Sequence, residues 1–232
     1  MIEHKLFAPK ASAFPIKITS YHWPDLDGIA SAYALKQLLL KKNCGQAEVM
    51  FSQTPQKEAL WVMEQLHLSF PFKVEEWMKS GSRQEQVILV DASDPQDLPS
   101  NFPLTQIQAV IDHRSYSDVS SMPLATCWID PVGSNATLIG ELYVSLGIEP
   151  DKVSANLLYA AIMSNTVELS SGNTTQRDRF LIHALQATSS IRPDFVKEMF
   201  QAKSCVRSGL LYDRMNADLS TKSHNALAKR VA

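Results

Sequence analysis

The stretch His22-Trp23-Pro24-Asp25-Leu26-Asp27-Gly28 joins two patterns of different period. Residues 15–21 before it predict a strand, and residues 28–42 after it, rich in Ala and Leu and free of Pro, predict a buried helix. Strand, polar turn and buried helix are how an open α/β sheet begins, and such sheets place ligands at the carboxyl ends of their strands. The two carboxylates and the imidazole of this turn are therefore candidate metal ligands.

Two further apolar runs also end in acids. Residues 86–91 form a continuous apolar run that ends at Asp91, and residues 107–111 form another that ends in Asp112-His113-Arg114. Such runs predict strands covered on both faces. Because the carboxyl ends of parallel strands meet at one edge, the acids of all three strands are expected to be neighbours there. Clustered carboxylates repel one another, and divalent cations resolve that repulsion.

The other patterns complete an α/β chain. The further predicted strands are residues 48–52, 72–77 and 125–129, and the further predicted helices are residues 56–66, 136–146, 152–164, 176–187 and 193–202. The predicted fold is an open, mainly parallel β-sheet with helices on both faces. We expect one domain over residues 1–205 and a tail over residues 206–232 that is partly helical or disordered.

Composition excludes several classes of protein. Of 232 residues, 45% are hydrophobic and 20% charged, and the net charge is −2, so nothing indicates long nucleic acid or an anionic membrane as a partner. The sequence contains no run of roughly 18 apolar residues and no N-terminal leader pattern, which predicts a cytoplasmic protein. The three cysteines are widely spaced, which favours neither a disulfide framework nor a thiolate zinc site.

Together these motifs resemble the DHH phosphoesterase superfamily. Residues 24–32 (Pro-Asp-Leu-Asp-Gly-Ile-Ala-Ser-Ala) resemble its first motif, Asp91 its second, and Asp112-His113-Arg114 its third. Arg in place of a second His is the variant of the Prune-like exopolyphosphatase branch. Residues 131–137 and 161–166, followed by Thr174, Thr175 and Asp178, are similar to segments of the family II, manganese-dependent inorganic pyrophosphatases. The resemblance covers residues 15–205.

The resemblance implies a two-metal site for Mn²⁺ or Mg²⁺. The implied ligands of one ion are His22, Asp25 and Asp91, and those of the second are Asp27, Asp91 and His113, with Asp91 bridging. Asp112 would orient His113, as an acid behind a metal-bound imidazole commonly does. Arg114 would bind a phosphate oxygen, a task that suits its planar fork.

The sequence departs from the family pattern in three places. His22 lies three residues before Asp25, whereas the pyrophosphatases space this His four before, so a loop or capping role is the alternative. Asn165 stands where the family places a metal-binding Asp. Its amide oxygen can still coordinate, but it brings no charge, so the second metal is expected to bind more weakly. The family's second, C-terminal domain is expected to be missing, which would leave the site open unless an oligomer partner covers it. Further candidates for phosphate contacts, or else for plain surface positions, are Arg177, Lys203, Arg207 and Arg214.

The expected function is a metal-dependent phosphohydrolase acting on pyrophosphate, polyphosphate or a small nucleotide through a metal-activated water. One alternative is a weakened or inactive binding or scaffold protein, which Asn165 and the missing domain favour. Another is a haloacid dehalogenase-like phosphatase, since a strand followed by Asp-Leu-Asp-Gly is also its nucleophile motif. Against that class, Trp23-Pro24 interrupts the strand and no late acidic pair follows. The expected partner is a small phosphorylated substrate, and a homo-oligomer is left open.

Overall fold

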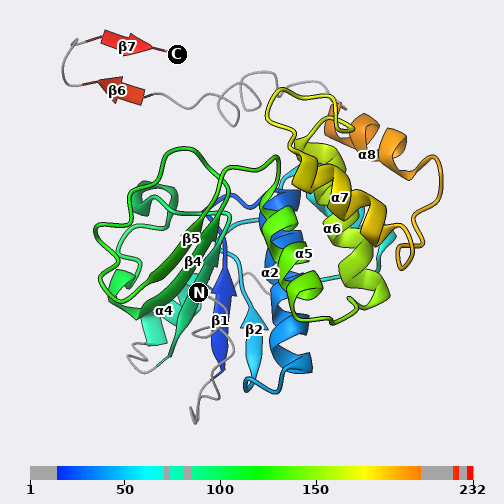
Figure 1. The fold of residues 1–232 in the computed structure, drawn as a ribbon. Coiled ribbons are helices and arrows are strands. Elements are labelled where there is room, and N and C mark those ends of the chain that lie inside the picture. The colour runs from blue at the N-terminus through cyan, green and yellow to red at the C-terminus, as the bar shows by residue number, and fades with distance from the viewer. Residues whose placement is uncertain (1–14, 71–73, 81–84, 205–221, 225–228, 232) are drawn as a thin grey trace.

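A computed structural model describes residues 15–70, 74–80, 85–204, 222–224 and 229–231 of the chain. Within these ranges, five strands form one sheet in the order β2-β1-β3-β4-β5, and every neighbouring pair is parallel (Figure 1). The strands are β1 (Ile16–Thr19), β2 (Ala47–Val49), β3 (Val87–Val90), β4 (Ile107–Asp112) and β5 (Thr126–Ile129). The carboxyl ends of all five therefore lie at one edge of the sheet.

Seven α-helices and two short 3₁₀ turns accompany this sheet in the described ranges. The helices are α2 (Leu26–Lys41), α3 (Lys57–Gln65), α4 (Val74–Ser80), α5 (Asn135–Ser145), α6 (Lys152–Asn165), α7 (Gln176–Leu185) and α8 (Phe195–Ser204). The 3₁₀ turns are η1 (Pro95–Asp97) and η2 (Leu104–Gln106). No helix in these ranges is both long and apolar enough to cross a membrane.

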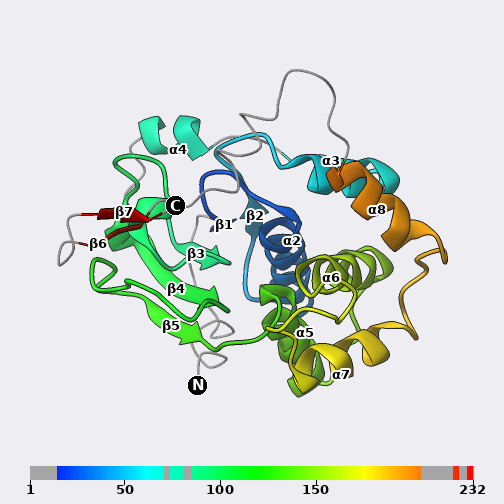
Figure 2. The same ribbon diagram turned by 90° about the horizontal axis from the view of Figure 1, so that it is seen from above.

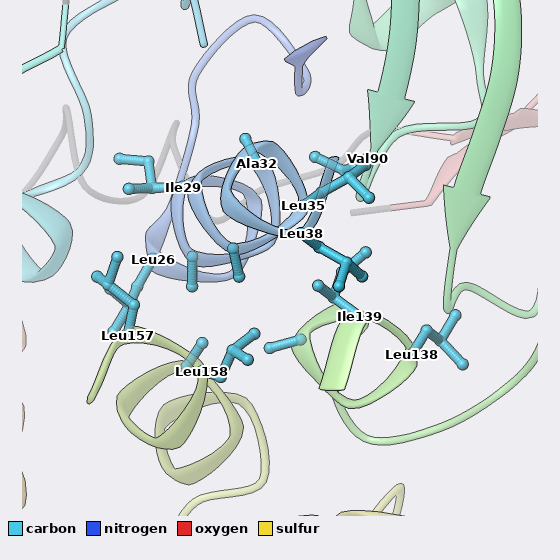
Figure 3. Packing of buried hydrophobic residues seen from close by; sticks show 14 of the residues in the cluster. Leu26, Ile29, Ala32, Leu35, Leu38, Val90, Leu138, Ile139, Leu157 and Leu158 are labelled. Carbon is cyan, nitrogen blue, oxygen red and sulfur yellow. The ribbon is translucent and has the colours of Figure 1, made fainter. Parts of the chain in front are cut away.

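The side chains of each strand alternate between two hydrophobic cores, one on each face of the sheet. Ile88 and Val90 of β3 join the larger core, where α2 packs against α5 and α6 (Figure 3). Val87 and Leu89 join the smaller core, which includes Val74 of α4. Figure 2 shows α2, α5 and α6 grouped together beside the sheet. The predicted class, an open parallel sheet covered on both faces, is confirmed.

One prediction of secondary structure is wrong. Residues 74–77, predicted as part of a strand over 72–77, form the start of α4, while residues 72–73 lie outside the described residues. Val74 and Trp77 are one helical turn apart and both buried, so a helix brings them to the same core. In the tail, the described residues form β6 (Lys222–His224) and β7 (Lys229–Val231), which pair antiparallel, and the rest of the tail lies outside the described residues. The division into a domain and a tail stays a prediction.

Candidate metal centre

Three side chains that are far apart in the sequence meet at the carboxyl edge of the sheet. Asp27 comes from the first turn of α2, Asp91 follows β3, and His113 follows β4. One ligand atom from each lies within 4.8 Å of the other two. The Nε2 atom of His113 is 3.4 Å from Oδ1 of Asp91 and 3.7 Å from Oδ2 of Asp27. Two carboxylates and an imidazole are a donor set that suits Mn²⁺ or Mg²⁺ better than a thiolate-seeking metal.

The carboxylate of Asp27 is held by the N-terminus of α5. Its Oδ1 accepts hydrogen bonds from the Ser134 hydroxyl at 2.9 Å and the Ala136 amide at 2.8 Å. Its Oδ2 accepts from the Asn135 amide at 2.8 Å and from Nδ2 of Asn165 at 2.5 Å. A carboxylate offers about four lone-pair sites, so a cation that bound Asp27 would replace one of these four donors. Ser134 is also the N-cap of α5, since its hydroxyl oxygen accepts from the Ala136 amide.

The turn that carries these donors is fixed by a second buried carboxylate. Asp178, at the start of α7, accepts from the Gly133 amide at 3.0 and 3.1 Å and from the Thr137 hydroxyl at 2.6 Å. It also accepts from the amide and hydroxyl of Thr175, both at 2.6 Å, and the Asp178 amide donates to the Thr175 hydroxyl oxygen in return, which completes a capping box. A Cβ atom on Gly133 would lie 2.8 Å from Oδ2 of Asp178, so only glycine fits there. Asp178 therefore supports Asp27 from behind the turn.

The backbone of Asp91 is in the left-handed region, with φ of 55°. Among residues other than glycine, Asp and Asn tolerate this region best. Two hydrogen bonds hold the backbone there: the Asp91 amide donates to the Ile111 carbonyl at 2.8 Å, and the Asp91 carbonyl accepts from Arg114 at 3.0 Å. The left-handed residue ends the strand abruptly and leaves the side chain facing Asp27 and His113.

Arg114 is directed at groups of the protein itself. One terminal nitrogen pairs with the Asp97 carboxylate and the other donates to the Asp91 carbonyl, while Nε lies 3.8 Å from Asp112. The guanidinium also lies 5.2 Å from the ring centre of Tyr21, within the range of a cation–π contact. Burial lowers the pKa of Arg114, but the neighbouring carboxylates outweigh burial and raise it overall.

The imidazole of His113 is oriented by a carbonyl rather than by Asp112. Its Nδ1 lies 2.9 Å from the Val132 carbonyl, which directs Nε2 toward the two acids. Asp112 instead accepts from the backbone amide of His113 at 2.7 Å and from the hydroxyl of Ser93. In this structure the Val132 carbonyl, and not Asp112 as expected, contacts the ring, while Asp112 holds the backbone of His113. The sequence could not reveal Val132, because a backbone carbonyl leaves no trace in residue type.

The titration of these groups follows from their burial. Burial raises the pKa of Asp27 to about 6, although the charge of His113 and the backbone amides of Ala136 and Asn135 oppose it. Burial likewise raises the pKa of Asp91, and the charge of Asp27 adds to the effect. For His113, burial lowers the pKa, but the hydrogen bond to Asp91 and the two carboxylate charges raise it to about 10. The three-residue group therefore favours positive charge, which a protonated imidazole or a divalent cation can supply.

Asp25 lies near this group without belonging to it. Oδ1 of Asp25 caps α2 by accepting from the Gly28 amide at 3.0 Å, and Asp25 also accepts a hydrogen bond from the Tyr21 hydroxyl. Its charge raises the pKa of both Asp27 and Asp91, which places it close to them. Nδ1 of His22 is buried without a hydrogen-bond partner in the described structure. A buried ring nitrogen without a hydrogen-bond partner calls for an explanation, and binding of a cation would satisfy it.

The other basic candidates have protein partners where the structure describes them. Arg177 makes a two-pronged contact with Glu141, at 2.6 and 2.7 Å, and a third bond to Asp130. Lys203 lies 2.9 Å from buried Glu58 and 3.0 Å from Ser164. Neither is directed at the three-residue group in these contacts. The remaining two candidates, Arg207 and Arg214, lie outside the described residues.

Known proteins are similar to this chain both in sequence and in fold. Residues 15–162, more than half of the chain, match the model of the "DHH family, N-terminal domain". A protein of Clostridium acetobutylicum, named as a manganese-dependent inorganic pyrophosphatase, is 28% identical over 204 residues, which are 88% of this chain and 64% of that protein. A Streptococcus pyogenes protein of the same name is 27% identical over 94% of this chain and 70% of its own length.

Two solved structures have the same fold. The structure of a Methanococcus jannaschii protein, named as a family II inorganic pyrophosphatase, matches 82% of this chain and 62% of its own with a TM-score of 0.69 and 27% identity. An exopolyphosphatase-related protein of Bacteroides fragilis matches 95% of this chain and 64% of its own with a TM-score of 0.67. That second match, at 18% identity, supports the fold alone.

The chain thus spans about two thirds of the length of the relatives it matches. The family match agrees with the resemblance drawn from Asp91 and Asp112-His113-Arg114, and it decides against the haloacid dehalogenase-like alternative. On its sequence and its fold, this chain belongs to the DHH family.

Proposed function

We propose that this chain is a Mn²⁺- or Mg²⁺-dependent phosphohydrolase that acts on a phosphoanhydride or phosphodiester, with pyrophosphate or short polyphosphate as its first candidate substrate. The observation that carries the proposal is the meeting of Asp27, Asp91 and His113 at the carboxyl edge of the sheet. The relatives named as manganese-dependent inorganic pyrophosphatases support the choice of metal and of substrate class.

The proposed ligands are Asp27, Asp91 and His113, with Asp25 and His22 as further candidate ligands. A bound divalent cation would supply Lewis-acid activation of water and of a phosphoryl oxygen. The protein itself sets the geometry: Val132 holds the imidazole, and the α5 cradle holds Asp27. Because Asp27 and Asp91 are buried, their attraction to a cation is screened less by water than that of surface acids.

The test is release of phosphate from pyrophosphate and short polyphosphates, measured with Mn²⁺, with Mg²⁺ and with EDTA. We expect turnover that needs the metal and that falls in Asp91→Asn by more than the roughly 10- to 100-fold typical of residues that only support a ligand. Asp118→Asn is the matched control, because its carboxylate bonds only to nearby Ser120 in the described contacts. Equal turnover in the EDTA and Mn²⁺ reactions would refute the proposal.

A second candidate is a binding module that has lost turnover, and Asn165 favours it. Its amide donates to Asp27 where the family resemblance expects a charged ligand. A module of this kind would bind pyrophosphate or a nucleotide in calorimetry without releasing phosphate. The same substrate panel, run for binding and for turnover, separates the two candidates, since only the enzyme gives metal-dependent product.

A further inference from the structure

Asp97 and Arg114 connect the three loops that carry the proposed ligands. Asp97 ends η1, in the loop after β3, and its backbone carbonyl accepts a hydrogen bond from the amide of His22 at 2.7 Å. Its carboxylate pairs with Arg114, in the loop after β4. One residue thus joins the loop after β1 to the loop after β4, although nothing in the sequence around Asp97 marks it.

Arg114 carries the connection onward to two proposed ligands. It donates to the carbonyl of Asp91, whose left-handed backbone needs support on both sides of the residue. It also packs over Tyr21, whose hydroxyl donates to Asp25. A planar guanidinium can satisfy several partners at once in fixed directions, which a lysine ammonium cannot reproduce.

We propose that Asp97 and Arg114 form a clamp that positions Asp91 and the His22–Asp25 loop for metal binding, so that Arg114 is a positioning residue rather than a phosphate contact. The inference rests on the proposed function, in which Asp91 is a ligand. It departs from the role that the family resemblance assigns to Arg114. Both side chains of the clamp are only about one third exposed, 33% for Arg114 and 38% for Asp97.

The contacts of Arg114 argue against a free phosphate-binding fork. Both terminal nitrogens already have acceptors, and Nε lies beside Asp112. A phosphate that displaced Asp97 or the Asp91 carbonyl from this guanidinium would release a proposed ligand loop, so a phosphate contact would have to use the remaining N–H groups. Supporting residues of metal ligands typically contribute on the order of 10- to 100-fold to metal affinity. The clamp should therefore act on metal affinity before it acts on substrate affinity.

The experiment measures Mn²⁺ affinity without substrate, by the electron paramagnetic resonance signal of free Mn²⁺, in the wild type, Arg114→Lys, Asp97→Asn and Asp97→Glu. We expect Arg114→Lys and Asp97→Asn to weaken Mn²⁺ binding by about tenfold or more. Asp97→Glu keeps the carboxylate and should therefore bind Mn²⁺ more tightly than Asp97→Asn does. At saturating Mn²⁺, the KM for pyrophosphate should stay within about twofold of wild type in both weakened variants. Glu198→Gln, which removes the charge of Glu198 from its ion pair with Arg192 at similar exposure, is the control.

A second readout does not depend on metal or turnover. In metal-free protein, amide exchange of residues 20–24 and 90–92 should be faster in Arg114→Lys and Asp97→Asn than in Glu198→Gln. Unchanged Mn²⁺ affinity with a raised KM would overturn the clamp and assign Arg114 to phosphate. Unchanged exchange in both segments would also overturn it. If the wild type binds no Mn²⁺, the proposed function fails while the exchange experiment still decides whether the clamp exists.

Discussion

The variant Asn165→Asp tests the metal centre at the residue where this chain departs from the family pattern. Nδ2 of Asn165 donates to Oδ2 of Asp27 at 2.5 Å, so the amide neutralises part of a buried carboxylate. An aspartate there would turn this hydrogen bond into a contact between two anions. Without metal the variant should be less stable than the wild type, and with Mn²⁺ it should bind the ion more tightly.

The size of the penalty can be bounded in two ways. Two unit charges about 4 Å apart at an effective dielectric constant of about 20 repel by roughly 4 kcal/mol. The protein can escape this repulsion by protonating Asp27, whose pKa is about 6 in the folded protein, at a cost of about 1.4 kcal/mol at pH 7. Metal-free Asn165→Asp should therefore lose about 1.4 kcal/mol of unfolding free energy at pH 7. At pH 5 Asp27 is already largely protonated in the folded protein, so the loss should be close to zero.

Urea unfolding in EDTA at the two pH values measures this loss, and a Mn²⁺ titration of the folded protein measures the gain. Asn165→Gln is a matched control, because it changes the length of the side chain without adding charge. The reasoning would be refuted if Asn165→Asp were as stable as the wild type in EDTA at pH 7 and bound Mn²⁺ with unchanged affinity. That result would mean that the amide of Asn165 does not face Asp27.

Three further perturbations test other parts of the account. Gly28→Ala should lose about 1 to 3 kcal/mol of unfolding free energy, because its Cβ would lie 2.3 Å from the buried Ser20 hydroxyl; a loss below about 0.5 kcal/mol would contradict that packing. Val167→Gly should have an unfolding free energy equal to that of the wild type or up to about 1 kcal/mol higher. Val167 is exposed and has a φ of 48°, a region that strains a β-branched residue. A clear loss of unfolding free energy in urea would contradict this. Metal-free protein should lose stability as pH rises from about 4 to 6 through Asp27 and from about 6.5 to 10 through His113, because the folded state binds more protons than the unfolded state in both windows. Unfolding free energy that rises with pH there, measured in EDTA, would reverse the assigned signs.

The sequence predicted the sheet and its acidic edge because the signals are local. A continuous apolar run that ends in an acid, as at Asp91 and Asp112, needs only neighbouring residues to be recognised. The strand predicted over residues 72–77 is wrong in its described part, residues 74–77, because a short apolar alternation also fits a helix when Val74 and Trp77 are one turn apart. Packing of both side chains against the sheet decided between the two periods.

The site was predictable in its ligand types but not in its supports. Asp27, Asp91 and His113 could be named from motifs, and the structure brings them together. Motifs could not predict the direction of the Asn165 amide or the partners of Arg114, because both depend on groups distant in the chain. The cradle of Asp27 consists largely of backbone amides, and Val132 contributes only a carbonyl. Residue identity carries no record of such contacts, so they became visible only in three dimensions.

The most direct test of the metal centre is a crystal of this protein soaked in Mn²⁺, with diffraction data collected at the manganese absorption edge. The account predicts an anomalous peak within ligand distance of Asp91 and of His113 or Asp25. It also predicts that the peak disappears in Asp91→Asn crystals treated in the same way. Wild-type crystals without a peak at this edge of the sheet, or a peak that persists in Asp91→Asn, would contradict the metal centre.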